Sequence, residues 1–162
     1  PKNLVPRGEL MWLSDMAWGG LTKVGKGPGD MACHNFDSGL SGYLDTHHGA
    51  SLGVLTPRWM EIMAPIRTDL FSEFARRVMQ VYEKDDLKAA EEGVRRYKEW
   101  LKKVGAPNTL ADVMPKGREL NGKVLDEAAE AAWNVNGQNI GQIKKWDLEE
   151  LRDVYEKCTV PY

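Results

Sequence analysis

The sequence lacks a long apolar run, an excess of basic residues and a set of cysteines. Its stretches free of Asp, Glu, Lys and Arg, such as residues 46–57, are too short and too polar to span a membrane. The net charge is −2, and basic residues alternate with acidic ones along helical stretches, which argues against a nucleic-acid binder. Cys33 and Cys158 lie near opposite ends of a chain that is neither small nor cysteine-rich, which favours reduced thiols over a disulfide.

The sequence also lacks runs of alternating β-branched residues, internal repeats and low-complexity tracts. With 162 residues, 42% of them hydrophobic and 28% charged, it suits a single globular domain with a sizeable core. No signal-peptide pattern is present at the N-terminus, so we expect a cytoplasmic protein. Because the chain starts at Pro1 without an initiator Met and runs straight into a helical pattern, we expect a fragment whose natural start lies upstream.

Apolar residues recur at helical spacing along most of the chain, which predicts an all-α domain with short loops. The expected helices cover residues 7–21, 31–44, 49–63, 66–82, 86–104, 125–133 and 147–158, with a short helical turn at 109–113. Gly19 and Gly20 end the first helix, and Asp30 caps the second. Pro57 either kinks the third helix or starts its second half. Asp85 or Asp86 caps the charged fifth helix.

Two of the three histidines, His34 and His48, lie fourteen residues apart. On one unbroken helix this spacing would separate them by roughly 21 Å, too far to share a metal ion. Gly39 and Gly42 weaken the helix, and residues 45–49 are typical of a turn before a new apolar run. The first histidine is thus expected on one helix and the second at the start of the next. On spacing alone, a structural or surface histidine is the commoner outcome.

Several segments resemble the C-terminal domain of the iron-containing (group III) alcohol dehydrogenases, which have a dehydroquinate synthase-like fold, and are most similar to the butanol dehydrogenase branch. Met31-Ala-Cys-His34 resembles the first histidine motif of that branch. Residues 48–60 resemble its His-Gly motif and the following helix. Residues 7–13, 104–110 and 147–155 resemble its helix start, its Gly-x-Pro-x-x-Leu turn and its last helix. The resemblance therefore covers nearly the whole chain.

The resemblance implies that His34 and His48 are two of four ligands to a divalent metal, Fe²⁺ or Zn²⁺. The other two ligands and the α/β domain that binds NAD(P)H would lie before Pro1, so residues 1–162 would form a partial, single helical metal-binding domain without cofactor-binding residues of its own. In the family the metal acts as a Lewis acid while hydride transfer interconverts an alcohol and an aldehyde. The isolated chain is then expected to be inactive.

One position departs from the family pattern. Ser38 stands where the family has a histidine that is thought to relay the alcohol proton, and a serine hydroxyl is a poor acid or base. His47 is an extra histidine that either compensates or lies at the surface. Gly39, Gly42 and Gly53 replace larger residues, which would widen the substrate pocket or loosen the helix. The alternative function is a non-catalytic helical interaction domain that kept the fold. The natural substrate, NADH or NADPH preference and any homo-oligomer lie beyond the sequence.

Overall fold

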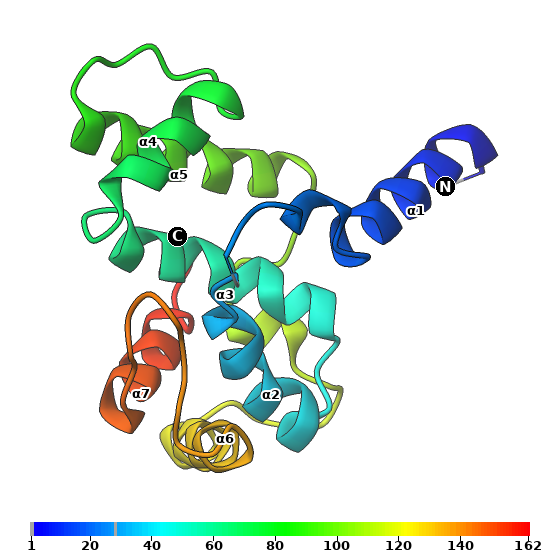
Figure 1. Ribbon diagram of the computed structural model, residues 1–162. Coiled ribbons are helices and arrows are strands. Elements are labelled where there is room, and N and C mark those ends of the chain that lie inside the picture. The colour runs from blue at the N-terminus through cyan, green and yellow to red at the C-terminus, as the bar shows by residue number, and fades with distance from the viewer. Residues whose placement is uncertain (1, 28) are drawn as a thin grey trace. The chain divides into compact units, whose positions relative to one another are not determined.

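The computed structural model describes residues 2–27 and 29–162, so Pro1 and Pro28 lie outside the described chain. Across the described residues there are seven α-helices and two short 3-10 helices, and the sole β-type pairing is an isolated bridge between Ile140 and Trp146 (Figure 1). The predicted all-α fold is therefore confirmed. The chain divides into two compact units, one up to Asp30 and the other Met31–Tyr162.

The first unit consists of α1 (Leu4–Trp18) and the short helix η1 (Leu21–Lys23). Helix α1 starts earlier than predicted because Pro6 falls within the first turn, where a missing backbone N–H removes no intrahelical bond. As predicted, the helix ends at the glycine pair, and Gly20 adopts a left-handed φ of 90°. The helix has no buried residue, and its Trp12 and Trp18 side chains are 60% and 70% exposed.

The second unit contains the remaining helices. They are α2 (Ala32–Leu44), α3 (His48–Met63), α4 (Thr68–Arg77), α5 (Asp86–Lys103), η2 (Leu110–Val113), α6 (Gly122–Val135) and α7 (Leu148–Lys157). Helix α2 packs against both α3 and α6, α4 packs against α5, and α7 packs against α6 and α3 (Figure 1). Helices α2 and α3, which carry the predicted metal ligands, therefore lie within the packed part of this unit.

Side-chain caps set most helix starts in this unit. Asp85, one of the two predicted caps, accepts a hydrogen bond from the backbone of α5, and Thr109 does the same for η2. Asp147 starts α7 in a reciprocal capping box with Glu150. Asn121 caps α6 and extends this helix to Gly122, three residues before its predicted start.

Further predicted boundaries are wrong. Helix α2 begins at Ala32, so its N-cap residue is Met31 and not Asp30. Helix α4 ends at Arg77 instead of residue 82, because the chain turns back through a left-handed Gln80 and buries Val81 against the helix that it has just left. Helix α6 continues to Val135, two residues beyond its expected end.

Pro57 lies inside α3, which continues unbroken from His48 to Met63. A proline inside a helix removes one backbone hydrogen bond, to the carbonyl four residues earlier, which here belongs to Gly53. The Pro57 ring is buried, so packing around it offsets part of that loss. The proline therefore does not divide the helix into two elements.

The core of the second unit lies between α2, α3, α6 and α7. Its fully buried side chains include Phe36, Leu40, Leu44, Val54, Leu55, Met63, Leu151, Val154 and Tyr155. Helices α2 and α6 approach closely at Gly39, where an added Cβ would lie 2.0 Å from the Ala128 carbonyl oxygen and 2.8 Å from the Ala132 Cβ. Gly39 therefore makes room for α6 and does not widen a substrate pocket.

Both cysteines are free thiols, as predicted, with Cys33 partly buried and Cys158 fully buried. Burial raises the pKa of the Cys158 thiol to about 12. Among the described helices, none combines the length and the apolar character that a membrane crossing requires.

Candidate metal centre

A sharp turn between α2 and α3 brings the two histidines together. Asp45 ends α2 in the left-handed conformation, with φ 61°, which aspartate tolerates better than most residues. The Thr46 hydroxyl then lies 2.7 Å from that of Ser51 in the first turn of α3. His47 is the N-cap residue of α3, and its side chain is exposed. The helix break predicted between His34 and His48 is thus confirmed.

The imidazole rings of His34 and His48 lie beside each other. Their centroids are 5.2 Å apart and the ring planes are tilted by 34°. With metal–nitrogen distances of about 2.1 Å and a tetrahedral angle, two histidine ligands of one ion have ring centroids roughly 5 Å apart. The His48 side chain is 54% exposed and His34 is partly buried, so the pair is open to solvent. Spacing and donor type therefore fit two ligands of a divalent ion.

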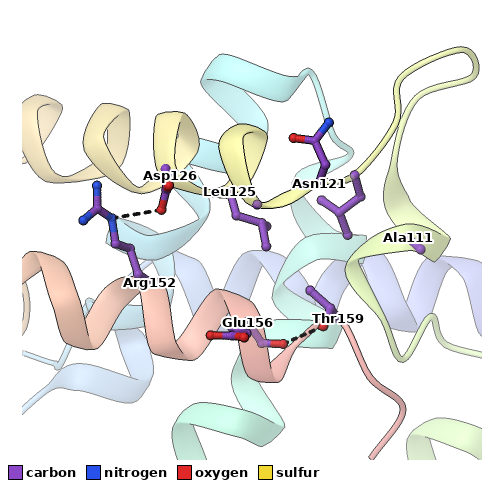
Figure 2. A pocket seen from close by; sticks show the side chains of 9 residues that line it. Ala111, Asn121, Leu125, Asp126, Arg152, Glu156 and Thr159 are labelled. Carbon is purple, nitrogen blue, oxygen red and sulfur yellow. Dashed lines mark hydrogen bonds and ion pairs between the residues drawn. The ribbon is translucent and has the colours of Figure 1, made fainter.

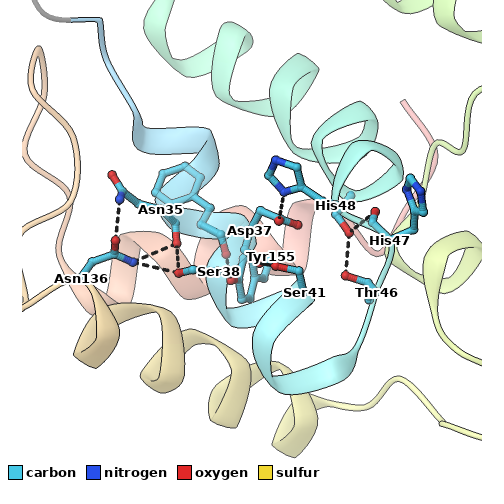
Figure 3. A network of polar contacts seen from close by, with 11 residues as sticks. Asn35, Asp37, Ser38, Ser41, Thr46, His47, His48, Asn136 and Tyr155 are labelled. Carbon is cyan, nitrogen blue, oxygen red and sulfur yellow. Dashed lines mark hydrogen bonds and ion pairs between the residues drawn. The ribbon is translucent and has the colours of Figure 1, made fainter. Parts of the chain in front are cut away.

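The buried carboxylate of Asp37 contacts the imidazole ring of His48. Asp37 lies one turn after His34 on α2, and its Oδ2 is 2.5 Å from the Nδ1 of His48 (Figure 3). The Asp37 side chain is 1% exposed. The contact joins the middle of α2 to the first residue of α3 and orients the His48 ring.

In the part of the chain that the structure describes, no group of three or more His, Cys, Asp or Glu side chains is arranged to hold a metal ion. Asp30, Asp37 and Asp45 are the nearest acidic residues in the sequence to the histidine pair. None of them completes a three-ligand cluster with both imidazoles. The described residues therefore supply two candidate ligands, which would be half of a four-ligand site.

Ser38 points toward α6 and is held in a hydrogen-bond network (Figure 3). Its hydroxyl donates to the Asn35 carbonyl at 2.6 Å and accepts from the Asn136 amide at 2.9 Å. Asn136 also accepts from the Asn35 side chain at 2.5 Å and donates to the Ala132 carbonyl at 2.7 Å. The hydroxyl proton of Ser38 is therefore engaged in a hydrogen bond within α2.

Tyr155 supports the same segment from α7. Its buried hydroxyl donates to the Phe36 carbonyl, the residue immediately before Asp37 (Figure 3). Burial, together with electrostatic repulsion by the nearby Asp37 carboxylate, raises the pKa of the Tyr155 phenol well above its usual value. Tyr155 therefore remains a neutral donor that fixes the backbone of α2 beneath the two imidazoles.

A separate pocket lies where α6, α7 and the segment around η2 meet (Figure 2). Arg152 pairs there with Asp126 at 3.2 Å, and the Thr159 hydroxyl donates to the Glu156 carbonyl at 2.7 Å. The Arg152 guanidinium and the Thr159 hydroxyl of this pocket therefore already have partners within it. It is lined by none of the predicted site residues.

Sequence reasoning missed Asp37, Asn136 and Tyr155. The proximity of Asp37 to the histidine pair was predictable, because a residue three positions after His34 lies on the same face of the helix. Asn136 and Tyr155 reach α2 across 98 to 119 residues of chain. No local pattern in one sequence reports such contacts.

Comparison with known proteins agrees with this geometry. Residues 3–158 match the family model described as the C-terminal part of the Fe-containing alcohol dehydrogenase family, so the chain belongs to this family. The resemblance seen in the histidine motifs is thereby confirmed.

Particular relatives are butanol dehydrogenases. The chain is 29% identical over 155 residues to NADH-dependent butanol dehydrogenase A of Clostridium acetobutylicum, which covers 93% of this chain and 38% of the relative. It is 30% identical over 155 residues to the probable NADH-dependent butanol dehydrogenase 1 of Bacillus subtilis, covering 94% and 38%. The crystal structure of NADH-dependent butanol dehydrogenase A from Thermotoga maritima superimposes with a TM-score of 0.80 at 26% identity, covering 92% and 38%. The chain thus spans about 38% of the length of these relatives.

Proposed function

We propose that this chain is the helical metal-binding part of an NAD(P)-dependent oxidoreductase that interconverts alcohols and aldehydes. The observation that carries the proposal is the pairing of the His34 and His48 rings at 5.2 Å within a chain of the Fe-containing alcohol dehydrogenase family. The two imidazoles would hold Fe²⁺ or Zn²⁺, and groups outside these 162 residues would supply the remaining ligands and the nicotinamide site. The relatives' names specify NADH and butanol for those proteins; for this chain both are part of the proposal.

A divalent ion bound there would supply Lewis acidity toward the oxygen of the substrate. The residues of this chain would orient and support the site. Asp37 holds the His48 ring, Tyr155 holds the backbone of α2, and the half-exposed His48 leaves the pair accessible from outside. Ser38 would occupy the relay position without acting as a base, because its hydroxyl already donates to the Asn35 carbonyl.

The test is metal stoichiometry in the complete dehydrogenase that carries this domain. His34→Ala and His48→Ala should each remove the metal and nearly all alcohol oxidation, because a four-ligand site loses both affinity and geometry with one imidazole. His47→Ala is the matched control, since this neighbouring histidine is exposed at the N-cap of α3, and it should keep its metal. Full metal occupancy in His48→Ala would contradict the ligand assignment.

The engaged Ser38 hydroxyl is the observation that favours the alternative, a non-catalytic helical interaction domain. The two functions differ in metal content. A complete protein that purifies without metal and cannot be loaded with Fe²⁺ or Zn²⁺ would favour the interaction domain, whereas stoichiometric metal that depends on both histidines would favour the oxidoreductase.

A further inference from the structure

The carboxylate of Asp37 is an unusual group to find in this helical core. The side chain is 1% exposed and lies on a helix whose neighbouring buried residues, Phe36 and Leu40, are apolar. Its Oδ2 contacts the Nδ1 of His48, and its Oδ1 is buried without a hydrogen-bond partner among the described residues. Burying a carboxylate costs free energy unless hydrogen bonds compensate it. A purely structural contact to His48 would be made at lower cost by a neutral side chain.

Two hydroxyl groups near Asp37 donate their hydrogen bonds to backbone carbonyls and not to its side chain. The nearby Tyr155 hydroxyl donates to the Phe36 carbonyl rather than to the carboxylate. The Ser41 hydroxyl, one turn along α2, donates to the Asp37 backbone carbonyl at 2.9 Å and not to its side chain. His48 is therefore the group that the Asp37 side chain contacts most directly.

The chemistry of imidazole gives this contact a specific consequence. A neutral imidazole carries one hydrogen, on either Nδ1 or Nε2, and an ionised carboxylate only accepts hydrogen bonds. A carboxylate at Nδ1 therefore places the hydrogen on that nitrogen and leaves the Nε2 lone pair available to a cation. Partners of this kind fix the ring orientation of a histidine ligand and raise its basicity.

We infer that Asp37 is a positioning residue for the metal centre, which holds His48 with its hydrogen on Nδ1 and its Nε2 directed to a divalent cation. This inference rests on the proposed function and adds a residue to it. Asp37 acts through His48 and is not itself a ligand, since among the described residues it forms no three-ligand cluster with the two imidazoles. The arrangement exists before any ion binds, so its signature is measurable in the metal-free chain.

The first measurement is the tautomer of His48. The chain has three histidines, so the ring nitrogens of a ¹⁵N-labelled sample are assignable with His34→Gln and His47→Gln variants. At about pH 8, above the ordinary histidine pKa of about 6.5, long-range ¹H–¹⁵N spectra report which nitrogen carries the hydrogen. We expect Nδ1–H at His48, and a shift toward Nε2–H in Asp37→Leu, which has no acceptor. A His48 with Nε2–H in the unmodified chain would overturn the inference.

The second measurement is Zn²⁺ affinity, followed by the ring-proton shifts of His34 and His48 as Zn²⁺ is added. Asp37→Leu should weaken binding by about tenfold or more, because loss of such a partner costs 10–100-fold in metal affinity. Asp37→Asn keeps the side-chain shape and a weaker acceptor, so its Zn²⁺ affinity should lie between those of the unmodified chain and Asp37→Leu. Ser41→Ala is the control on the same helix and should bind as the unmodified chain does. Thermal unfolding of each variant shows whether it is folded.

The outcomes separate this inference from the proposed function. If His48→Ala abolishes Zn²⁺ binding but folded Asp37→Leu and Asp37→Asn bind normally, the metal site stands and the role of Asp37 is refuted. If neither His34→Ala nor His48→Ala affects Zn²⁺ binding, the proposed function fails, and the inference that depends on it fails too. Loss of the Nδ1–H signature together with weakened Zn²⁺ binding in the Asp37 variants supports both.

Discussion

At the residue scale, Ser38 occupies the position for which the family resemblance predicts a proton relay. The hydroxyl donates to its own helix at 2.6 Å and accepts from Asn136 at 2.9 Å, so it has no second proton to pass on. A residue in this state contributes to packing and to the contact between α2 and α6. We expect it to contribute little to proton transfer.

In the complete dehydrogenase, Ser38→Ala should leave the metal content unchanged and lower kcat by less than about tenfold, below the 10²–10⁴-fold typical of a general acid or base. Ser38→His should raise kcat and add a titration near the ordinary histidine pKa of about 6.5. The measurement is the pH profile of kcat alongside metal stoichiometry. An inactive Ser38→Ala with normal metal content would instead make Ser38 an essential catalytic residue.

Cys158 gives a second prediction at this scale. Because burial raises its pKa to about 12, roughly one thiol in a thousand would be ionised at pH 9 even with free access, and the thiolate is the reactive form. In a Cys33→Ser variant, we expect a thiol reagent to label Cys158 only when the chain unfolds, so that the rate rises steeply with added urea. Rapid, complete labelling of the native variant would contradict the buried, protonated state.

At the scale of elements, the site depends on how closely α2 approaches α6. Gly39 allows this approach, since an added Cβ would meet the Ala128 backbone and the Ala132 side chain. Gly42 lies three residues later on the same helix, and an added Cβ there meets nothing within 4 Å. Gly39, at a helix contact, and Gly42, in open space, therefore allow the same substitution to be compared in two environments of one helix.

Gly39→Ala should lower the free energy of unfolding by about 3 kcal/mol or more, because the methyl group overpacks a backbone contact. Gly42→Ala should raise it by about 0.5–1 kcal/mol, because alanine loses less conformational freedom on folding than glycine does. Urea unfolding of both variants measures the difference. Equal effects of the two substitutions would show that α2 and α6 do not touch at Gly39.

Element types were predictable where the sequence carries local signals. Helix starts are recognisable at the capping residues Asp85, Thr109 and Asp147. The side chain of a capping residue accepts a hydrogen bond from a backbone N–H within three residues, so the signal is local. The end of α4 was not predictable, because Val81 continues the helical apolar pattern while the chain reverses through Gln80. For the site, the histidine pair followed from spacing and resemblance. The contact of Asn136 with Ser38 depends on tertiary packing, which a one-dimensional pattern does not encode.

At the scale of the whole molecule, the chain supplies two of the four proposed metal ligands and spans about 38% of the length of its butanol dehydrogenase relatives. Hydride transfer requires a nicotinamide held against the substrate carbon, and this sequence has no dinucleotide-binding fingerprint. We therefore expect the 162-residue chain by itself to bind Zn²⁺ more weakly than micromolar and to lack dehydrogenase activity.

The assay uses the purified chain with butanol, NAD⁺ or NADP⁺, and Fe²⁺ or Zn²⁺, followed by reduced-nicotinamide absorbance, with a sample containing only metal and cofactor as the blank. Calorimetry with Zn²⁺ gives the affinity. Turnover above the blank, or sub-micromolar Zn²⁺ binding that His34→Ala abolishes, would show that residues within this chain complete the site.

The short connection between α2 and α3 has a consequence for how the site forms. His34, Asp37 and His48 all come from one segment of fifteen residues, closed by the left-handed turn at Asp45. Closing so small a loop costs little chain entropy, and local contacts form faster than distant ones. The two histidines and the carboxylate that contacts His48 therefore form a nearly self-contained helical hairpin, and we expect that it can be transferred to another pair of helices joined by the same turn.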